Sequence, residues 1–277
     1  MASYNFTGKV ALVTGAGRGL GASIAKELAS HGASVVANYS KSASAAQSVV
    51  EAIRALPFSP QAIAIQADVS RTPEVTRLFN EALAHFGRLD IVVSNSGMEV
   101  FCPEEDVTEE LYDRIFALNT RAQFFVAQHA LKHVTENGRL ILTSSVAAAL
   151  TGIPNHALYA GSKAAVEAFT RSFAVDCGKK NITVNAIAPG GIITDMFVEN
   201  SWHYAPGADQ SWSIDKIEQG LANLCPLKRT GQPVDVARVV AFLVSEEGEW
   251  INGKAFGSRL LAIRKIKPAN NEFCIKI

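Results

Sequence analysis

Short apolar runs rich in β-branched residues recur along this chain and alternate with longer helical patterns. The runs that read as strands cover residues 9–14, 33–38, 61–67, 89–94, 139–143 and 183–188. Their side chains show little alternation between polar and apolar, which is typical of parallel strands covered by helices on both faces. The intervening segments are long enough to form crossover helices. The pattern therefore predicts an α/β fold built on a doubly wound parallel sheet with helices on both faces.

Length and charge limit the organisation and the partners of the chain. At 277 residues it can bury one substantial core, and we expect a single domain over residues 1–277. The 26 basic residues equal the 26 acidic ones, so the formal net charge is zero. A neutral chain has no general attraction for a polyanion or an acidic membrane surface. We therefore expect a small-molecule substrate, with no nucleic-acid or membrane partner.

Other classes of protein have sequence signals that are missing here. Residues 1–7 show no basic stretch followed by an apolar run, and no segment holds the roughly eighteen unbroken apolar residues of a membrane span. These observations favour a soluble, cytoplasmic enzyme. Cys102, Cys177, Cys225 and Cys274 lie far apart, unlike the cysteines of zinc sites or disulfide frameworks. We expect them to be buried free thiols, and we expect no metal site.

A glycine-rich segment, residues 14–21 with the sequence TGAGRGLG, directly follows the first strand. Glycines there allow a tight turn, let the backbone approach a pyrophosphate and leave the amides of the next helix pointing at its negative charge. A glycine string alone also fits a simple turn. Placed between a first strand and a first helix, it predicts a Rossmann-type dinucleotide site. The phosphates would lie against Gly15, Arg18, Gly19, Leu20 and Gly21.

The end of the second strand indicates which dinucleotide is bound. Enzymes that select NAD usually carry an acid there, about twenty residues after the glycines, which binds the ribose hydroxyls. In this chain the position holds Asn38, followed by Tyr39, Ser40 and Lys41. Together with Arg18 they offer donors and positive charge, and no carboxylate that would repel a 2′-phosphate. The predicted cofactor is therefore NADPH.

A tyrosine and a lysine four positions apart, Tyr159 and Lys163, begin a further helical pattern. This spacing places both side chains on one face of a helix. A free phenol titrates at about pH 10, and an adjacent ammonium stabilises the phenolate and brings it into a useful range. The spacing alone also occurs by chance on exposed helices. Beside the glycine turn, it predicts an oxidoreductase in which Tyr159 exchanges a proton with the substrate oxygen.

Over about residues 8–253 the chain resembles the short-chain dehydrogenase/reductase family, on the glycine segment and on the Tyr-x-x-x-Lys motif. The resemblance implies that Asn119 holds a proton-relay water and that the Ser145 hydroxyl binds and orients the substrate oxygen. Ser144 is the neighbouring alternative to Ser145. Lys163 is implied to bind the nicotinamide ribose as well. The implied catalytic group is therefore Asn119, Ser145, Tyr159 and Lys163.

The resemblance also extends the cofactor site. It implies an adenine contact at the end of the third strand, a backbone loop after the fourth strand and a loop facing the nicotinamide after the sixth. These further cofactor contacts are Asp68, Val69, Asn95, Ser96, Gly97, Arg121, Pro189, Gly190, Ile192 and Thr194.

Within the family, residues 94–97, 119–125 and 188–191 resemble those of fungal polyketide ketoreductases of secondary metabolism. These are above all hydroxynaphthalene reductases, with related anthraquinone and 17β-hydroxysteroid enzymes, which take flat polycyclic ketones. A substrate lid is expected at about residues 191–225, and we expect Met196, Trp202 and Tyr204 to contact the substrate together with Ser145 and Tyr159. The alternative is that the lid packs its aromatic rings into the core.

The sequence thus predicts an NADPH-dependent ketoreductase that reduces a carbonyl on a polycyclic aromatic or polyketide-type substrate, with Tyr159 as the proton donor. The resemblance implies a homo-oligomer, a tetramer or a dimer. Other enzymes of this fold remain open, namely a 3-oxoacyl thioester reductase and a steroid or sugar alcohol dehydrogenase. An NADPH-sensing scaffold without catalysis is the alternative outside enzymes.

The C-terminal segment departs from the family pattern. Relatives form a last strand and reach an Asp-Gly-Gly ending within about a dozen residues of position 253, whereas this chain continues into a basic tail. We expect an atypical tail at about residues 255–277, with residues 260–263 as the candidate last strand. Past Gly257 we expect poor order or a different packing.

Overall fold

The predicted strands form one parallel sheet in the computed structural model, which describes residues 4–57, 60–149 and 153–257. Seven strands lie in the order β3-β2-β1-β4-β5-β6-β7, and every pair of neighbours is parallel. The strands are β1 (Val10–Val13), β2 (Ser34–Tyr39), β3 (Ala62–Gln66), β4 (Ile91–Ser94), β5 (Arg139–Thr143), β6 (Thr183–Ala188) and β7 (Ala255–Gly257).

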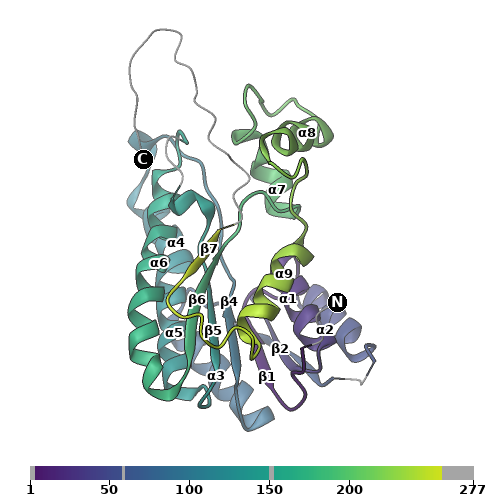
Figure 1. Cartoon of the computed structure of the whole chain (residues 1–277). Coiled ribbons are helices and arrows are strands. Elements are labelled where there is room, and N and C mark those ends of the chain that lie inside the picture. The colour runs from purple at the N-terminus through teal and green to yellow at the C-terminus, as the bar shows by residue number, and fades with distance from the viewer. Residues whose placement is uncertain (1–3, 58–59, 150–152, 258–277) are drawn as a thin grey trace.

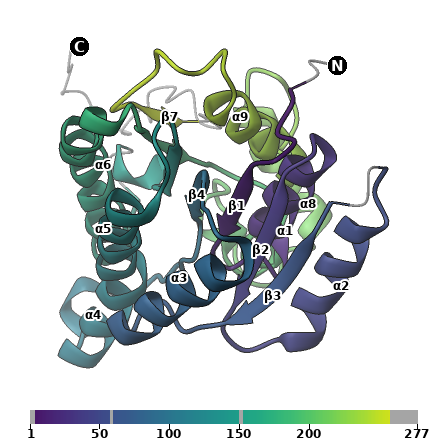
Figure 2. The same ribbon diagram turned by 90° about the horizontal axis from the view of Figure 1, so that it is seen from below.

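Helices cover both faces of this sheet, as predicted, and the view from below shows the sheet between the two layers (Figure 2). One layer holds α1 (Gly19–Ser30), α2 (Ala43–Arg54) and α9 (Pro233–Val244), and the other holds α3 (Thr72–Phe86), α4 (Glu109–Phe116), α5 (Ala122–His133) and α6 (Ala157–Cys177). Two further helices, α7 (Asp195–Asn200) and α8 (Ile214–Leu224), lie beyond the carboxyl ends of the strands (Figure 1).

The apolar strand residues explain why the sheet is enclosed on both sides. Alternate residues of β1 face opposite layers: Ala11 and Val13 pack with α1, α2 and α9, whereas Val10 and Leu12 pack with α3, α5 and α6. All four are buried. Strands without a polar face can be stabilised only by covering both faces, so the pattern read from the sequence accounts for the two helical layers.

The order of the strands creates a crevice at one end of the sheet. From β1 the chain first builds outward through β2 to β3, and it then returns to the other side of β1 and continues from β4 to β7. The connections that leave β1 and β4 therefore diverge at the carboxyl ends of these two strands. In open α/β sheets, ligands bind at such a topological switch point.

The seventh strand corrects the prediction for the C-terminal segment. Ala255–Gly257, the first residues of the predicted tail, pair with Ala186–Ala188 of β6 at the edge of the sheet. Backbone bonds support this edge, because Ala186 N donates to Lys254 O over 2.7 Å and Gly253 N to Val184 O over 2.8 Å. The candidate strand at residues 260–263, and the order of the chain past Gly257, lie outside the described residues.

The predicted lid segment, residues 191–225, has a small core of its own. Phe197, Ala205, Ile217, Leu221 and Cys225 are buried together in it. Trp202, Tyr204 and Trp212 pack against this cluster while staying partly exposed. The alternative was that the lid packs its aromatic rings into the core. Phe197 is buried, but it packs against other lid residues.

Two smaller expectations can be compared with the structure. Cys177 and Cys225 are buried free thiols as predicted, whereas Cys102 is only partly buried, and Cys274 lies outside the described residues. Among the helices of the described ranges, none has the length and apolar character needed to cross a membrane.

Candidate active site at the switch point

The glycine turn is built around the carboxyl ends of β1 and β4. The Thr14 hydroxyl accepts hydrogen bonds from Asn95 N (2.9 Å) and Ser96 N (3.0 Å), and Asn95 Nδ2 donates to Thr14 O over 3.0 Å. The turn and the loop after β4 are thereby joined. A Cβ atom on Gly21 would lie 2.3 Å from Gly15 O, closer than any real contact. Only glycine fits there, so the backbone itself forms the surface of the turn.

The start of α1 suits the diphosphate of a dinucleotide. Arg18, the residue before the helix, makes no side-chain cap, and the first turn contains no acid. The first amides of a helix lack partners within the helix and carry its positive dipole end, so they attract an anion. A glycine surface on the turn and uncapped amides on the helix are what a bound pyrophosphate requires.

The Asn38 side chain was predicted to contact the cofactor, but in the structure it makes hydrogen bonds within the protein. Its side chain is 1% exposed, and its Nδ2 donates to Ile65 O (3.2 Å) and Ala67 O (3.1 Å). Its Oδ1 accepts from Gly15 N over 3.3 Å. The amide thus ties the glycine turn to β2 and β3, and its donors are already used. At the corner predicted for the 2′-phosphate, the accessible side chains are those of Ser40, Lys41 and Arg18.

Arg18 reaches across the crevice to the lid. Its Nη1 lies 3.0 Å from Asp195 Oδ2, and the two side chains are 76% and 64% exposed. Asp195 is the first residue of α7, and the Thr194 hydroxyl caps that helix by accepting from Phe197 N over 3.3 Å. An ion pair this exposed contributes little free energy. It is therefore a contact that a stronger anion can replace.

The loop after β6 completes this side of the crevice. Pro189 O accepts from Val146 N over 3.1 Å, and Ile193 N donates to Gly231 O over 2.9 Å. Ile192 is buried and forms a parallel bridge with Gly231. The predicted nicotinamide loop, which also contains Gly190, is thus fixed at both ends by backbone bonds.

On the side predicted to bind adenine, Asp68 Oδ1 accepts hydrogen bonds from Ser70 N (3.1 Å) and from Ser70 Oγ (2.7 Å).

Asn119 lies on a π-helical turn, Ala117–Arg121, inserted between α4 and α5. Such turns are rare and occur often at functional sites. The Asn119 side chain is buried, accepts from Met98 N (2.9 Å) and donates to Met98 O (2.8 Å) and to Ser162 Oγ (3.1 Å). It holds the loop after β4 against α6. Arg121, at the end of the turn, is exposed and donates to Ser70 O over 3.3 Å.

The structure distinguishes the two candidate serines. Ser144 Oγ donates to Lys163 O and lies 3.1 Å from Glu167 Oε1, so this side chain faces the body of α6. Ser145 Oγ accepts from Ala147 N over 3.2 Å, and the Ser145 side chain acts on the Tyr159 phenol by lowering its pKa. Ser145 is therefore the serine that shares the site with Tyr159.

Tyr159 and Lys163 lie on α6 and are both buried. Lys163 Nζ donates to Thr143 O over 2.9 Å and lies 5.9 Å from the centre of the Tyr159 ring. A Cβ atom on Gly97 would lie 3.1 Å from Lys163 Nζ and 3.3 Å from Asn119 Oδ1. The loop after β4, the π-helical turn and α6 thus come together around Lys163. The four predicted catalytic residues therefore lie near one another.

The direction of the Tyr159 pKa differs from the expectation. Burial raises the pKa of the phenol above its ordinary value, the Glu99 carboxylate acts in the same direction, and the hydrogen bond with Ser145 lowers it. Burial lowers the pKa of Lys163 to about 8, and Glu99 partly opposes this. The prediction of a lowered tyrosine pKa was wrong because the effects of burial and of Glu99 outweigh the lowering effect of Ser145. Tyr159 is held as a neutral phenol, the form that donates a proton.

Sequence reasoning missed two polar residues beside Tyr159. His156 is 1% exposed, and its ring lies 4.8 Å from the Tyr159 ring. Its Nε2 lies 3.2 Å from Glu99 Oε1, and the Tyr204 hydroxyl donates to the same oxygen. Of the lid residues predicted to contact substrate, Tyr204 thus reaches the catalytic side. Trp202 stacks on His203 at 3.5 Å, and Met196 is exposed.

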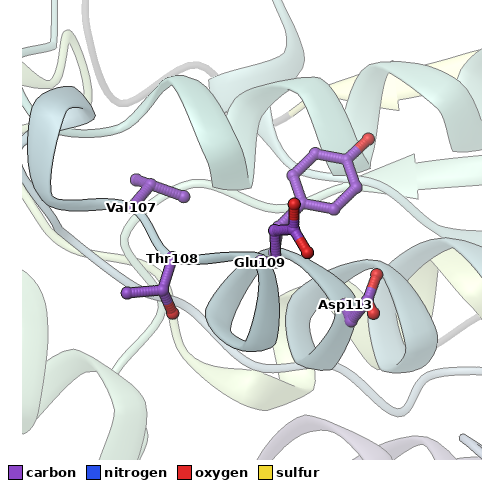
Figure 3. A pocket seen from close by; sticks show the side chains of 5 residues that line it. Val107, Thr108, Glu109 and Asp113 are labelled. Carbon is purple, nitrogen blue, oxygen red and sulfur yellow. The ribbon is translucent and has the colours of Figure 1, made fainter.

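A separate shallow pocket opens at the start of α4. Its lining residues are Val107, Thr108, Glu109, Tyr112 and Asp113, and the labelled acids Glu109 and Asp113 lie on the same helix (Figure 3). It contains none of the predicted catalytic or cofactor residues.

Comparison with known proteins identifies the family. The sequence matches the family model described as Enoyl-(Acyl carrier protein) reductase over residues 15–257. It is similar to a tetrahydroxynaphthalene reductase from Pestalotiopsis fici, with 62% identity over 249 residues, 90% of this chain and 89% of that protein. A hydroxynaphthalene reductase from Aspergillus fumigatus is 58% identical over 250 residues, 90% of each chain.

Solved structures agree with this assignment. A short-chain dehydrogenase from Burkholderia cenocepacia in complex with NADP is 37% identical, with a TM-score of 0.81 over 91% of this chain and 97% of that one. Levodione reductase is 30% identical, with a TM-score of 0.83 over 92% of this chain and 97% of that one. The chain belongs to the short-chain dehydrogenase/reductase family of oxidoreductases.

Proposed function

We propose that this protein is an NADPH-dependent ketoreductase that reduces a ring carbonyl of a polyhydroxylated naphthalene-type polyketide. The observation that carries the proposal is the buried Tyr159 phenol, with Lys163 Nζ 5.9 Å from its ring and Ser145 acting on its pKa, at the switch point. The substrate class is supported by the relatives named for hydroxynaphthalene and tetrahydroxynaphthalene. The cofactor is supported by the glycine turn, the uncapped helix and a structural neighbour solved with NADP.

The residues of this chain would divide the reaction between them. When bound, NADPH would supply the hydride that the carbonyl carbon accepts. The Ser145 hydroxyl orients the carbonyl oxygen, and Tyr159 gives that oxygen its proton. Lys163, fixed by Thr143 O, holds the nicotinamide ribose and returns a proton toward Tyr159. Asn119 keeps the loop after β4 against Lys163, and its part in a water relay stays a prediction.

The direct test follows NADPH oxidation with a panel of ketones. It compares hydroxylated tetralones and naphthol tautomers with a 3-oxoacyl thioester, a steroid ketone and a sugar ketone. The proposal expects the bicyclic aromatic ketones to have the highest kcat/KM. Preference for the thioester or the steroid would support one of the alternative enzymes. NADPH binding without turnover on any ketone would support the scaffold.

The pKa of Lys163 predicts an alkaline limit to cofactor capture. Because burial lowers this pKa to about 8, the free enzyme loses the ammonium charge as the pH rises through that value. We expect kcat/KM for NADPH, which reports groups of the free enzyme, to fall about tenfold per pH unit above pH 8. The same alkaline decrease, or limb, in kcat/KM should appear with NADH, which has no 2′-phosphate to titrate. A profile that stays flat to pH 9.5 for both cofactors would contradict this role of Lys163.

Arg18 and Asp195 predict opposite effects on cofactor selection. Arg18 is paired with the Asp195 carboxylate, which a doubly charged 2′-phosphate would replace. We expect Arg18→Ala to raise KM for NADPH about tenfold and to leave KM for NADH nearly unchanged. Asp195→Asn removes the competing anion, so its KM for NADPH should not rise. Equal losses for the two cofactors in Arg18→Ala would show that Arg18 does not read the 2′-phosphate.

We also propose that the chain acts as a single cytoplasmic domain and that it forms a homo-oligomer, a dimer or a tetramer. The helical face of α4 and α5 supports self-association, because Tyr112 and Phe124 are exposed there. Phe116, Phe124, Phe125 and Phe169 line a hollow on that face. Exposed aromatic patches of this kind mark protein contacts.

A further inference from the structure

Glu99, His156 and Tyr204 form a polar cluster beside the proton donor, which we call the Glu99 cluster. Glu99 lies in the loop after β4, His156 precedes α6 and Tyr204 belongs to the lid segment. Glu99 Oε1 lies 3.2 Å from His156 Nε2 and accepts a hydrogen bond from the Tyr204 hydroxyl. The Tyr204 hydroxyl also lies 3.2 Å from His156 Nε2. Proton transfer from Tyr159 needs none of these three groups.

The cluster adjoins the reaction centre and an aromatic wall. The His156 ring lies 4.8 Å from the Tyr159 ring on one side and stacks on Phe101 at 4.2 Å. Phe101 in turn stacks on His203 at 3.7 Å. Rings from three segments are therefore arranged side by side, leading from the catalytic tyrosine toward the lid. Such surfaces favour planar aromatic molecules.

Two atoms of the cluster are placed to accept a hydrogen bond from a ligand. Within the described part of the chain, His156 Nδ1 is buried without a hydrogen bond. The hydrogen bonds of Glu99 to His156 and Tyr204 both fall on Oε1, and Oε2 is not among the buried unpartnered atoms, so it is open to a ligand. In the tautomer with the proton on Nε2, the nitrogen that faces the carboxylate oxygen, Nδ1 is an acceptor. Buried polar groups in native proteins nearly always have partners. His156 Nδ1 therefore calls for a donor, and the open Glu99 Oε2 can accept from the same one. A phenolic hydroxyl is such a donor.

We infer that Glu99 and His156 form a second recognition site that accepts a hydrogen bond from a phenolic hydroxyl of the substrate, away from the carbonyl that is reduced. Tyr204 closes this site from the lid. The inference rests on the proposed function, since the substrate must be an aromatic ketone with an additional hydroxyl. Glu99 and His156 are thus specificity-determining residues. A site built to bind a hydroxyl discriminates strongly against an analogue that lacks it, because its acceptors would stay unpaired.

The test compares two bicyclic ketones that differ only in one phenolic hydroxyl, a tetralone and its hydroxylated counterparts, with NADPH saturating. We expect the unaltered protein to prefer a hydroxylated tetralone by about 10- to 100-fold in kcat/KM. Glu99→Gln should reduce that ratio to about threefold or less, because a neutral amide is the weaker acceptor. Glu105→Gln, an exposed acid on the neighbouring turn, is the matched control and should keep the full ratio.

A second variant and a second measurement keep the result interpretable. If Glu99→Gln does not fold, as judged by circular dichroism, Tyr204→Phe serves instead and should lower the same ratio by removing the lid partner of Glu99. Glu99→Gln should also move the alkaline limb of kcat/KM for NADPH to lower pH, since the Glu99 charge raises the pKa of Lys163. A limb that moves while the preference for the hydroxylated tetralone stays unchanged would show that Glu99 acts only through its charge on Lys163, and this would overturn the inference.

Failure of this inference can be separated from failure of the proposed function. Binding of 1-naphthol and of a dihydroxynaphthalene, measured by quenching of tryptophan fluorescence, needs no turnover. Tighter binding of the dihydroxynaphthalene that is lost in Glu99→Gln supports the recognition site even if no ketone is reduced. An equal hydroxyl preference in the unaltered protein and in Glu99→Gln overturns the inference, whether or not the protein is a ketoreductase.

Discussion

Tyr159→Phe is expected to lower kcat for ketone reduction by about 100- to 10,000-fold, the usual contribution of a positioned general acid. The substitution removes only the phenolic hydroxyl and keeps a buried ring of the same shape beside His156. The lost interaction acts in the transition state, so the dissociation constant of NADPH should change little. Steady-state turnover and NADPH fluorescence titration measure the two quantities separately.

Tyr112→Phe is the control for this experiment. Tyr112 loses the same hydroxyl, but it lies exposed on α4, away from the crevice. Its turnover should match that of the unaltered protein. A Tyr159→Phe protein that retained more than about a tenth of its turnover would exclude Tyr159 as the main proton donor.

Gly21→Ala is expected to destroy the cofactor site. Its Cβ would lie 2.3 Å from Gly15 O and 2.6 Å from Asn95 Nδ2, and the first of these neighbours is backbone that cannot move without opening the turn. Overpacking of this kind costs about 1–3 kcal/mol of stability. The displaced backbone would also no longer present its surface to the pyrophosphate, so we expect NADPH affinity to fall about 100-fold. Isothermal titration and chemical unfolding measure the two effects.

Gly161→Ala supplies a matched glycine substitution elsewhere in the chain. Gly161 lies within α6 between Tyr159 and Lys163, and a Cβ atom there would meet nothing within 4 Å. Alanine favours the helix by about 0.5–1 kcal/mol over glycine, so this variant should be slightly more stable and should bind NADPH normally. Similar losses of NADPH affinity in both variants would show that the clash at Gly21 is not the cause.

The regular part of the fold could be predicted because it depends on local pattern. Each of the six predicted strands lies within about two residues of an observed one, since strands that are apolar on both sides have a single stable environment. The seventh strand was not predicted. Ala255–Gly257 is short, includes a glycine and is partly exposed, so it lacks the apolar run by which the others are recognised. Its place comes from pairing with β6.

The site residues that belong to a motif of fixed spacing could be predicted from the sequence. Those whose positions depend on tertiary contacts could not. Tyr159 and Lys163 share a helix, so their relation follows from sequence. The choice of Ser145 over Ser144 depends on which side chain turns toward α6, which no spacing reveals. Glu99 and His156 lie 57 positions apart and become a unit only through folding. The raised pKa of Tyr159 comes from burial, which is also a property of the folded chain.

Burial of Asn38 also bears on how the coenzyme preference of this protein could be redesigned. The usual recipe introduces an acid at the end of the second strand to favour NADH. Here that carboxylate would replace an amide that donates to Ile65 O and Ala67 O, and it would face carbonyl oxygens without a proton to share. An acid at position 38 would therefore destabilise the sheet before it changed the coenzyme preference. Ser40 and Lys41, which face solvent, are the positions at which a designer should begin.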